Sequence, residues 1–447
     1  MTNEKYGLIG KTLVHSYSKE IHEALGRYQY QLFSLAEDEM PDFINTRDFR
    51  GLNVTIPYKK DVIPLCDEVT DLARGIGAVN TLFWKNASGT GSSESINQED
   101  KILVGHNTDY EGFLYAASRA GIEFEGKGVL ILGTGGTSLM ARRAAADQNA
   151  AKIYIASRHP ETDPPSGSEI QDAGILSTVS YDQLPEIADS IDVIVNTTPV
   201  GTFPNNMQQV IRLKDFPGCQ AVIDVIYNPF KTALLLEAEK LGLKYTNGLP
   251  MLVAQATAAA GYFLGTPGAF QKENQRIIKA MKQQMGNIVL IGMPGTGKSI
   301  IGKLLSELTG KTLQDTDAKI EEEAEMTIPE IFEKEGEAGF RDRESAVCKK
   351  LGKERNLIIA TGGGAILRPE NVAALRQNGT LVHITRSIDK LPTRGRPLSK
   401  NIEALKKMEA QRMPLYKSAA DITFRNNYTC SRKKLRQRVN TYILEKL

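Results

Sequence analysis

The sequence has few cysteines, a single tryptophan and no long apolar run. Its four cysteines lie far apart and form no C-x-x-C pair, which argues against a disulfide framework and against a structural zinc site. The sequence contains no run of about 18 apolar residues, which a membrane helix requires. Its N-terminal residues lack an apolar signal core. We therefore expect a cytoplasmic protein with reduced thiols.

The sequence also has little net charge, because 55 Lys and Arg residues nearly balance 53 Asp and Glu residues. The resulting charge of +2 gives no overall field that would attract nucleic acid or a membrane, and we expect neither as a partner. The composition, 41% hydrophobic and 24% charged, is typical of globular domains. A chain of 447 residues exceeds one ordinary core and predicts two or three domains, whereas its oligomeric state is not indicated.

Short apolar segments alternate with segments of helical length, which predicts an α/β fold built on parallel sheets. A polar Gly/Ser stretch at 86–100 is expected to form an exposed hairpin tip. The segment 248–265 is apolar and rich in small residues, and we expect a helix that packs against another domain. The strands are expected at 6–10, 30–35, 52–56, 78–84, 102–105, 129–132, 152–157, 192–196, 221–225 and 287–292, and further helices at about 109–120, 140–147 and 271–286.

A first glycine-rich turn, Gly133-Thr134-Gly135-Gly136-Thr137-Ser138, lies between a strand and a helix. Glycine at the first position lets the chain bend, and at the third it lets the backbone approach a pyrophosphate, which a helix N-terminus also attracts. Ser138 replaces the last glycine, so a tight turn that binds nothing is the alternative. Arg158 ends the next strand and favours the 2′-phosphate of NADP over NAD, unless it is merely solvated.

Several short polar motifs lie in order around this turn. They are His15-Ser16-Tyr17-Ser18, the segments 53–59 and 77–81, Asn107-Thr108-Asp109, the segment 226–229, and Gly248 with Gln255. Together they resemble the motifs of shikimate dehydrogenases, over roughly residues 6 to 270. Thr12, Ser18-Lys19 and His22-Glu23 depart from the usual family residues.

The resemblance implies that Lys59 and Asp109 are the catalytic pair. This fits the chemistry, because reduction of a ring ketone by hydride requires a proton donor at the new alkoxide. A solvated loop lysine and a helix N-cap are the alternatives for these two residues. The implied substrate contacts are Ser16, Ser18, Thr55, Lys59, Asn80, Asp109, Tyr227 and Gln255. The implied NADP(H) contacts are Gly133, Thr134, Gly135, Gly136, Thr137, Ser157, Arg158, Val225 and Gly248.

A second glycine-rich turn, GMPGTGKS at 292–299, fits the pattern G-x-x-x-x-G-K-S between a strand and a helix. In such a loop the backbone N–H groups surround the β-phosphate, while Lys298 reaches the β- and γ-oxygens and Ser299 ligates Mg²⁺. We therefore expect ATP and Mg²⁺ here. The expected ATP contacts are Gly295, Thr296, Gly297, Lys298, Ser299 and Ile300, together with Arg396.

The motifs that follow are Asp315-Thr316-Asp317, the segments 340–344, 362–364 and 394–398, and the segment 412–416. They resemble those of shikimate kinases over residues 287–447. The resemblance implies that Asp315 supports Mg²⁺ and that Asp317 binds the hydroxyl to be phosphorylated. It implies that Arg341 and Arg412 bind the substrate carboxylate and that Gly363 lets the backbone approach the ring. It also implies that Arg396 closes from a lid onto the phosphates.

Two features of this kinase-like part go beyond the motifs. Glu344 follows Arg341 by three residues and is expected to hold its guanidinium in place. The stretch 386–396 is short for the family, which indicates a trimmed lid, and simple surface charge is the alternative for Arg394 and Arg396.

Together these motifs predict a bifunctional enzyme that reduces 3-dehydroshikimate to shikimate with NADPH and then phosphorylates shikimate with MgATP. We expect a substrate domain at 1–125, completed by a helix at about 249–285, a Rossmann domain at 126–248 and a P-loop kinase domain at 287–447. A quinate/shikimate dehydrogenase that oxidises with NAD is one alternative. A metabolite-sensing pseudoenzyme is another, but it would be expected to lose Lys59, Asp109, Lys298 or Asp317, and all four are present.

Overall fold

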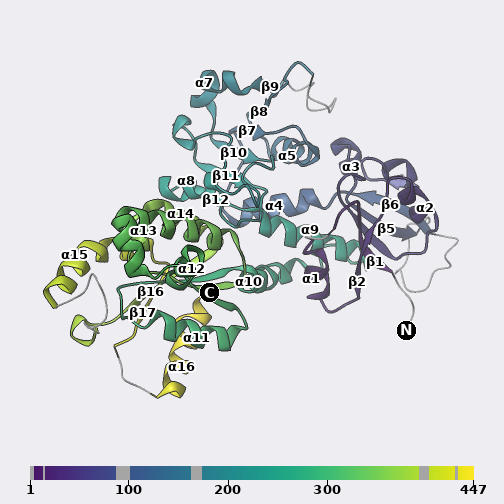
Figure 1. The fold of residues 1–447 in the computed structure, drawn as a ribbon. Coiled ribbons are helices and arrows are strands. Elements are labelled where there is room, and N and C mark those ends of the chain that lie inside the picture. Colours follow the sequence, from purple (N-terminus) through teal and green to yellow (C-terminus); the bar gives the residue numbers. More distant parts are fainter. Residues whose placement is uncertain (1–4, 14–15, 87–100, 163–173, 392–401, 428–430) are drawn as a thin grey trace. The chain divides into compact units, whose positions relative to one another are not determined.

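The computed structural model describes residues 5–13, 16–86, 101–162, 174–391, 402–427 and 431–447. The chain divides into two compact units, Met1–Thr202 with Gln208–Lys279, and Phe203–Met207 with Ala280–Leu447. The first unit contains two β-sheets and the second contains one (Figure 1).

The first sheet has the strand order β2-β1-β3-β5-β6-β4. Parallel pairs join β1 to β2 and β3, whereas β5 runs antiparallel to both β3 and β6. The sheet is mixed, because β5 runs opposite to its neighbours while the other pairs are parallel. The intervening residues 87–100, most of the expected hairpin tip, lie outside the described residues. The strands are β1 (Tyr6–Gly10), β2 (Tyr30–Ser34), β3 (Gly51–Val54), β4 (Glu68–Val69), β5 (Thr81–Asn86) and β6 (Lys101–His106).

The second sheet is fully parallel, with the order β12-β11-β10-β7-β8-β9. This order is typical of dinucleotide-binding domains, in which the ligand binds where the order reverses, here between β7 and β10. The strands are β7 (Gly128–Leu132), β8 (Lys152–Ser157), β9 (Leu176–Ser180), β10 (Val193–Asn196), β11 (Ala221–Asp224) and β12 (Lys244–Thr246).

The third sheet, in the second unit, is also parallel and has the order β14-β15-β13-β16-β17. Its central strand β13 leads directly into the second glycine-rich turn. The strands are β13 (Asn287–Ile291), β14 (Thr312–Asp315), β15 (Leu357–Ala360), β16 (Gly379–Thr385) and β17 (Ile422–Arg425).

The helices of the first unit include the expected helix at 248–265, now α9. Its expected packing against another domain was wrong, because the helix packs mainly against α4 of the same unit. The helix after the first glycine turn begins at Gly136, earlier than expected. In the first unit the helices are α1 (Ser18–Glu23), α2 (Glu39–Asn45), α3 (Asp71–Ile76), α4 (Asp109–Arg119), α5 (Gly136–Asp147), α7 (Leu184–Ile187), α8 (Ala233–Leu241) and α9 (Gly248–Phe263), followed by α10 (Asn274–Met285), which spans the division between the units.

The helices of the second unit surround the third sheet. They are α11 (Lys298–Thr309), α12 (Thr316–Ala324), α13 (Ile328–Lys353), α14 (Pro369–Arg376), α15 (Ile402–Ala419) and α16 (Arg432–Tyr442). In the part of the chain that the structure describes, no helix is both long and apolar enough to cross a membrane.

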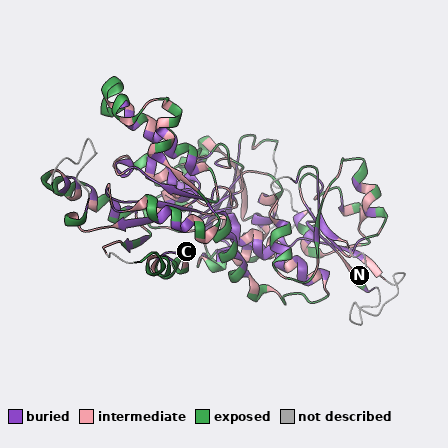
Figure 2. Cartoon of the chain, turned by 60° about the horizontal axis from the view of Figure 1, so that its bottom comes forward, coloured by how far each residue is buried: buried purple, intermediate pink, exposed green. Residues whose placement is uncertain are grey.

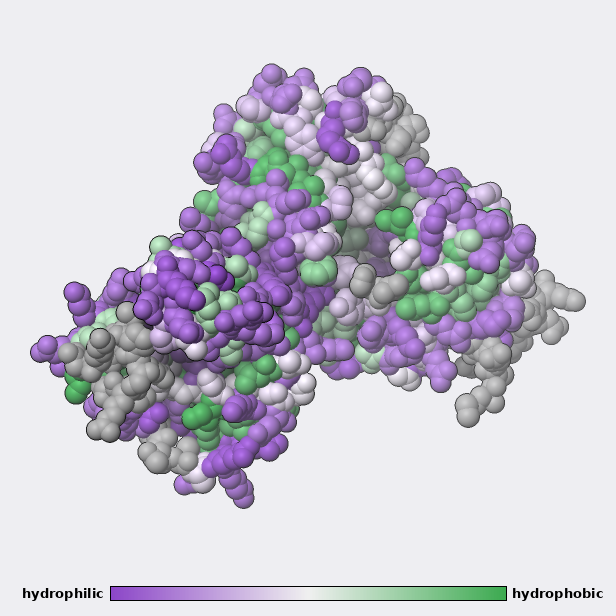
Figure 3. Space-filling model, in the orientation of Figure 1, coloured by the Kyte–Doolittle hydropathy of each residue, from purple (hydrophilic) through white to green (hydrophobic). Residues whose placement is uncertain are grey.

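The central strands of the parallel sheets are buried along their whole length. Every residue of β7 and of β13 is buried, and Figure 2 shows the strands as buried ribbons with helices exposed on their outer faces. Each fully buried Leu, Ile or Val contributes about 1.5–3 kcal/mol, so these parallel strands form the cores on which the loops are held. The face visible in Figure 3 is mainly hydrophilic, with apolar side chains in small groups.

Candidate active sites

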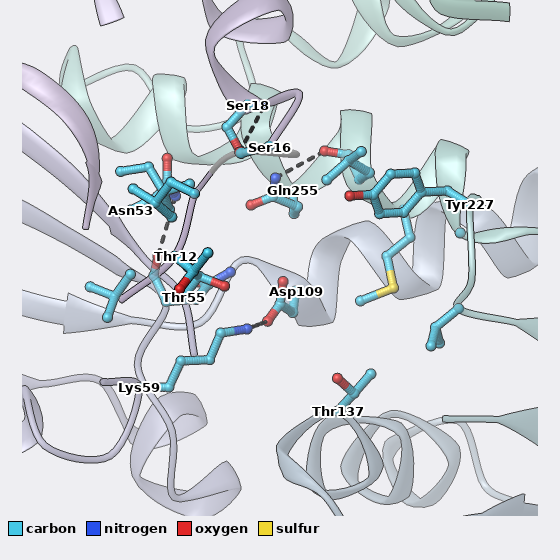
Figure 4. A pocket seen from close by; sticks show the side chains of 18 residues that line it. Thr12, Ser16, Ser18, Asn53, Thr55, Lys59, Asp109, Thr137, Tyr227 and Gln255 are labelled. Atoms are coloured by element: carbon cyan, nitrogen blue, oxygen red, sulfur yellow. Dashed lines mark hydrogen bonds and ion pairs between the residues drawn. The ribbon is translucent and has the colours of Figure 1, made fainter. Parts of the chain in front are cut away.

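A lysine–aspartate pair lies at the centre of the cleft in the first unit. Lys59 Nζ donates a hydrogen bond to Asp109 Oδ2 over 2.6 Å, and the two side chains point toward one another in Figure 4. The side chains are 23% and 16% exposed, so both are partly shielded and still reachable. Asp109 is the first residue of α4, and Thr108 occupies the N-cap position, so Asp109 is not the helix cap.

Backbone and amide hydrogen bonds hold both members of the pair. The N–H of Val79 donates to the carbonyl of Lys59 over 2.8 Å, which fixes the loop after β3. Asn80 Oδ1 accepts from the N–H of Thr108 over 2.7 Å, which fixes the start of α4 one residue before Asp109. The structure therefore gives Asn80 a structural role beside its expected contact with substrate.

The cleft around the pair has a volume of about 400 Å³ and is lined by all of the expected substrate residues. Three expected nucleotide residues, Thr137, Val225 and Gly248, line it as well. Thr12 and Asn53 line it but were not predicted as contacts. Asn53 is 4% exposed and donates a hydrogen bond to Thr81 Oγ1 over 3.2 Å. A polar residue within an otherwise apolar strand was the sequence signal that could have identified it.

The first glycine-rich turn leaves open space above the start of α5. A Cβ added at Gly135 or Gly136 would meet nothing within 4 Å, which leaves room for a pyrophosphate at the helix N-terminus. Ser157 is buried, and its Oγ accepts from the N–H of His159 over 2.9 Å, whereas Arg158 is exposed at the end of β8. The turn and Arg158 are thus accessible, while the Ser157 side chain supports the loop.

A buried carboxylate, Asp224, directly precedes Val225, which lines the cleft. Asp224, fully buried at the end of β11, accepts hydrogen bonds from Asn196 Nδ2, Thr232 Oγ1 and the N–H of Ile226. Burial raises its pKa to about 6, against the opposing effect of these donors. Just beyond, a Cβ at Gly248 would lie 1.9 Å from the carbonyl oxygen of Val225, so only glycine fits there. Asp224 was not predicted from the sequence.

Hydrogen bonds within the second glycine-rich turn hold its lysine and threonine side chains against its own backbone carbonyls. Lys298 Nζ donates to the carbonyls of Gly292 and Met293 over 2.8 and 3.1 Å. Thr296 is buried and its Oγ1 donates to the Met293 carbonyl over 2.9 Å, so its side chain stabilises the turn. Asn426, which the sequence did not predict, donates from Nδ2 to the Thr296 carbonyl over 2.8 Å.

Oxygen ligands suited to Mg²⁺ lie beside this turn. Ser299 Oγ donates to Asp315 Oδ2 over 3.2 Å, which places a hydroxyl and a carboxylate together. Such hard oxygen donors, completed by phosphates and water, fit Mg²⁺. No cluster of three or more His, Cys, Asp or Glu side chains that could hold a metal occurs within the described residues.

Asp317 lies next to this pair and has a perturbed carboxyl group. Its Oδ1 is buried without a hydrogen-bond partner. Burial, with smaller contributions from the charges of Asp315 and Glu344, raises the pKa of Asp317 to about 6. A carboxylate that is easily protonated and faces a cavity suits proton transfer.

Arg341 and Arg412, which are far apart in the sequence, line the same cavity of about 670 Å³. Arg341 Nη1 donates to Glu344 Oε2 over 2.7 Å, which confirms the expected contact. Arg412 Nη1 donates to the carbonyl of Gly363 over 2.8 Å. A Cβ at Gly364 would lie 2.0 Å from Arg341 Nη1, so the guanidinium packs directly against this glycine and a larger residue would displace it. The expected lid residues Arg394 and Arg396 lie outside the described residues.

Comparison with known proteins gives a family for each part of the chain. The family model for the shikimate dehydrogenase substrate binding domain matches residues 8–82, and the model for shikimate kinase matches residues 294–447. The shikimate dehydrogenase (NADP(+)) of Caldicellulosiruptor bescii is 35% identical over 268 residues, 57% of this chain and 88% of that protein. The shikimate kinase of Nitrosomonas europaea is 48% identical over 145 residues, 31% of this chain and 69% of that protein.

Solved structures agree with the assignment of the first part. The crystal structure of a chorismate mutase/shikimate 5-dehydrogenase fusion protein from Clostridium acetobutylicum has a TM-score of 0.54 and 31% identity, covering 63% of this chain and 98% of that one. Together with the two sites, these matches show that the chain belongs to the shikimate dehydrogenase family through its N-terminal part and to the shikimate kinase family through its C-terminal part, and that it is a bifunctional enzyme of the shikimate pathway.

Proposed function

We propose that the cleft around Lys59 and Asp109 reduces 3-dehydroshikimate to shikimate with NADPH, and that the cavity around Lys298 and Asp317 phosphorylates shikimate with MgATP. The proposal rests on one observation: each cavity joins a nucleotide-binding glycine turn to a charged group placed for the chemistry. We also propose that residues 1–125 with about 249–285, 126–248 and 287–447 are the three functional domains.

In the reduction, bound NADPH supplies a hydride to the carbonyl carbon of the substrate. Lys59 donates a proton to the carbonyl oxygen as this oxygen gains negative charge. Asp109 keeps the ammonium group oriented through its 2.6 Å hydrogen bond and helps to restore the proton afterwards. Ser16, Ser18 and Gln255 offer hydroxyl and amide groups to the substrate from the other side of the cleft (Figure 4).

In the phosphorylation, Asp317 accepts the proton of the attacking hydroxyl. Arg341 and Arg412 hold the carboxylate of shikimate by charge-assisted hydrogen bonds, so the hydroxyl is positioned before reaction. Lys298 exchanges its contacts with loop carbonyls for phosphate oxygens, and Ser299 with Asp315 would hold Mg²⁺.

Replacing Arg158 by alanine is expected to raise the KM for NADPH by roughly tenfold and to leave the KM for NADH nearly unchanged, because only NADPH carries a 2′-phosphate for the guanidinium. Steady-state kinetics with each dinucleotide measure the effect. Arg119→Ala, which removes another exposed arginine of the same unit, is the control. An equal loss for both dinucleotides would show that Arg158 does not select NADP.

Replacing Arg341 by lysine keeps the charge but loses the planar fork, and it is expected to raise the KM for shikimate by roughly tenfold or more. Glu344→Gln should give a milder form of the same defect, since it weakens the 2.7 Å contact that holds the guanidinium. Kinase kinetics with each substrate varied in turn measure both effects, with Arg343→Lys on the same helix as the control. A rise in the KM for ATP alone would remove Arg341 from the acceptor site.

The proposed reactions can be tested directly against oxidation of quinate with NAD. Purified protein is given 3-dehydroshikimate with NADPH in one assay and quinate with NAD⁺ in another. Rapid turnover of the first pair and little of the second is expected. A preference for quinate and NAD⁺ would contradict the proposed substrate and cofactor.

A further inference from the structure

We propose that Arg386 binds the phosphates of the nucleotide in the kinase cavity. No motif or family resemblance singled out this residue. The inference rests on the proposed position of ATP at the turn 292–299, and it adds a cation that lies outside the turn itself.

Arg386 comes directly after β16, which lies parallel to β13 in the sheet, with Ile291 opposite His383. The end of β13 begins the glycine-rich turn, and a Cβ added at Gly292 would lie 2.3 Å from the carbonyl oxygen of Ile384. The chain before Arg386 is therefore in direct contact with the first residue of the turn. Arg386 lines the same cavity as Gly295, Gly297 and Lys298.

The guanidinium of Arg386 is the one in this cavity that lacks a protein partner among the described residues. The residue is half-buried, and its Nε is fully buried without a hydrogen-bond partner. By contrast, Arg341 contacts Glu344, and Arg412, whose Nε also lacks a partner, donates from Nη1 to the Gly363 carbonyl. Leaving a buried charged donor unpaired is costly, so an acceptor supplied by a ligand would stabilise this side chain.

The position of Arg386 favours phosphate over the substrate carboxylate. The two arginines proposed to hold the carboxylate lie against Gly363 and Gly364, whereas the backbone just before Arg386 lies against Gly292, the first residue of the turn. Asn427 Oδ1 accepts from the N–H of Ser387 over 2.7 Å, and Asn426 Nδ2 donates to the Thr296 carbonyl over 2.8 Å. Asn426 and Asn427 follow strand β17 directly. One of them therefore binds the glycine-rich turn, and the other binds the residue after Arg386. A planar guanidinium held beside phosphate-binding N–H groups suits two phosphate oxygens.

The test uses the full chain carrying Arg386→Ala or Arg386→Lys, with Arg436→Ala as a control because Arg436 is an exposed arginine on α16. Arg386→Ala is expected to raise the KM for ATP and the Kd for ADP by roughly tenfold. The Kd for adenosine, the KM for shikimate and the dehydrogenase rate should stay within about twofold. Arg386→Lys should recover part of the loss, because it keeps the charge without the fork.

Unchanged ADP affinity in a variant that still binds shikimate would overturn the proposal. An equal loss of ADP and adenosine affinity would also overturn it, because the contact would then be with the nucleoside. Lys298→Ala separates this inference from the proposed nucleotide position. If Lys298→Ala weakens ADP binding and neither Arg386 variant does, the role of Arg386 is wrong and the nucleotide position stands. If Lys298→Ala has no effect on ADP binding, the proposed nucleotide position is itself wrong. Should Arg386→Ala not fold, the comparison of ADP with adenosine in Arg386→Lys decides.

Discussion

Lys59→Ala is expected to lower the dehydrogenase kcat by roughly 10²- to 10⁴-fold while kinase activity on added shikimate stays within about twofold. The large loss follows because Lys59 is the only ammonium group among the described residues that line the cleft. Without it, no cationic proton donor remains among the described residues that line the cleft. The kinase is spared because Lys298 and Asp317 belong to the other compact unit.

The measurement follows NADPH oxidation with 3-dehydroshikimate and, separately, ADP release with shikimate and MgATP. Lys60→Ala is the matched control, because Lys60 is the adjacent residue and is exposed. A Lys59 variant that retained its dehydrogenase rate would exclude the lysine as the proton donor. Collapse of both activities in a well-folded variant would contradict the assignment of the two reactions to separate units.

Asp317→Asn is expected to lower the kinase kcat by roughly 10²- to 10⁴-fold, because an amide of nearly the same size cannot accept the proton of the attacking hydroxyl. The KM for ATP should change little, since Lys298 and the turn remain. Kinase kinetics measure the effect, and Asp389→Asn, at an exposed aspartate of the same unit, is the control.

The pH dependence of the wild-type kinase gives a second test of Asp317. Burial raises its pKa to about 6, so the carboxylate is ionised at neutral pH and becomes protonated as the pH falls through that value. The base is lost on the acid side, and kcat/KM for shikimate should fall by roughly tenfold per pH unit below the pKa. Bound Mg²⁺ favours the ionised form and would move the acid limb lower. A rate that rises on acidification would contradict the role of Asp317 as a base.

The features that were predictable from the sequence are those that depend on local pattern. Both glycine turns join a strand to a helix within a few residues, so their geometry is encoded in one short segment. The pairing of Lys59 with Asp109, and of Arg341 with Arg412 in one cavity, came from family resemblance, because no spacing rule brings such distant residues together. The structure brings Lys59 into contact with Asp109 and places Arg341 and Arg412 in one cavity, while their catalytic and binding roles stay predictions.

The features that sequence reasoning missed depend on which strands are neighbours. Asp224 has no motif of its own, and its role appears only when β10 and β11 pair and bring Asn196 to its carboxylate. Asn426 and Arg386 likewise gain their positions from the ends of β17 and β16 beside the turn. The hairpin expected at 86–100 agrees with the antiparallel pairing of β5 with β6. The antiparallel pairing of β3 with β5 had no signal in the sequence, because strand direction is set by the connection and not by composition.

The central claim is that one chain carries two consecutive reactions, and a coupled assay tests it most directly. Purified protein receives 3-dehydroshikimate, NADPH and MgATP, and the products are identified by mass. The account predicts shikimate 3-phosphate from the wild-type chain, shikimate alone from Lys298→Ala, and neither product from Lys59→Ala. Absence of shikimate 3-phosphate from a wild-type chain that forms shikimate, or its formation by Lys298→Ala at the wild-type rate, would contradict the account.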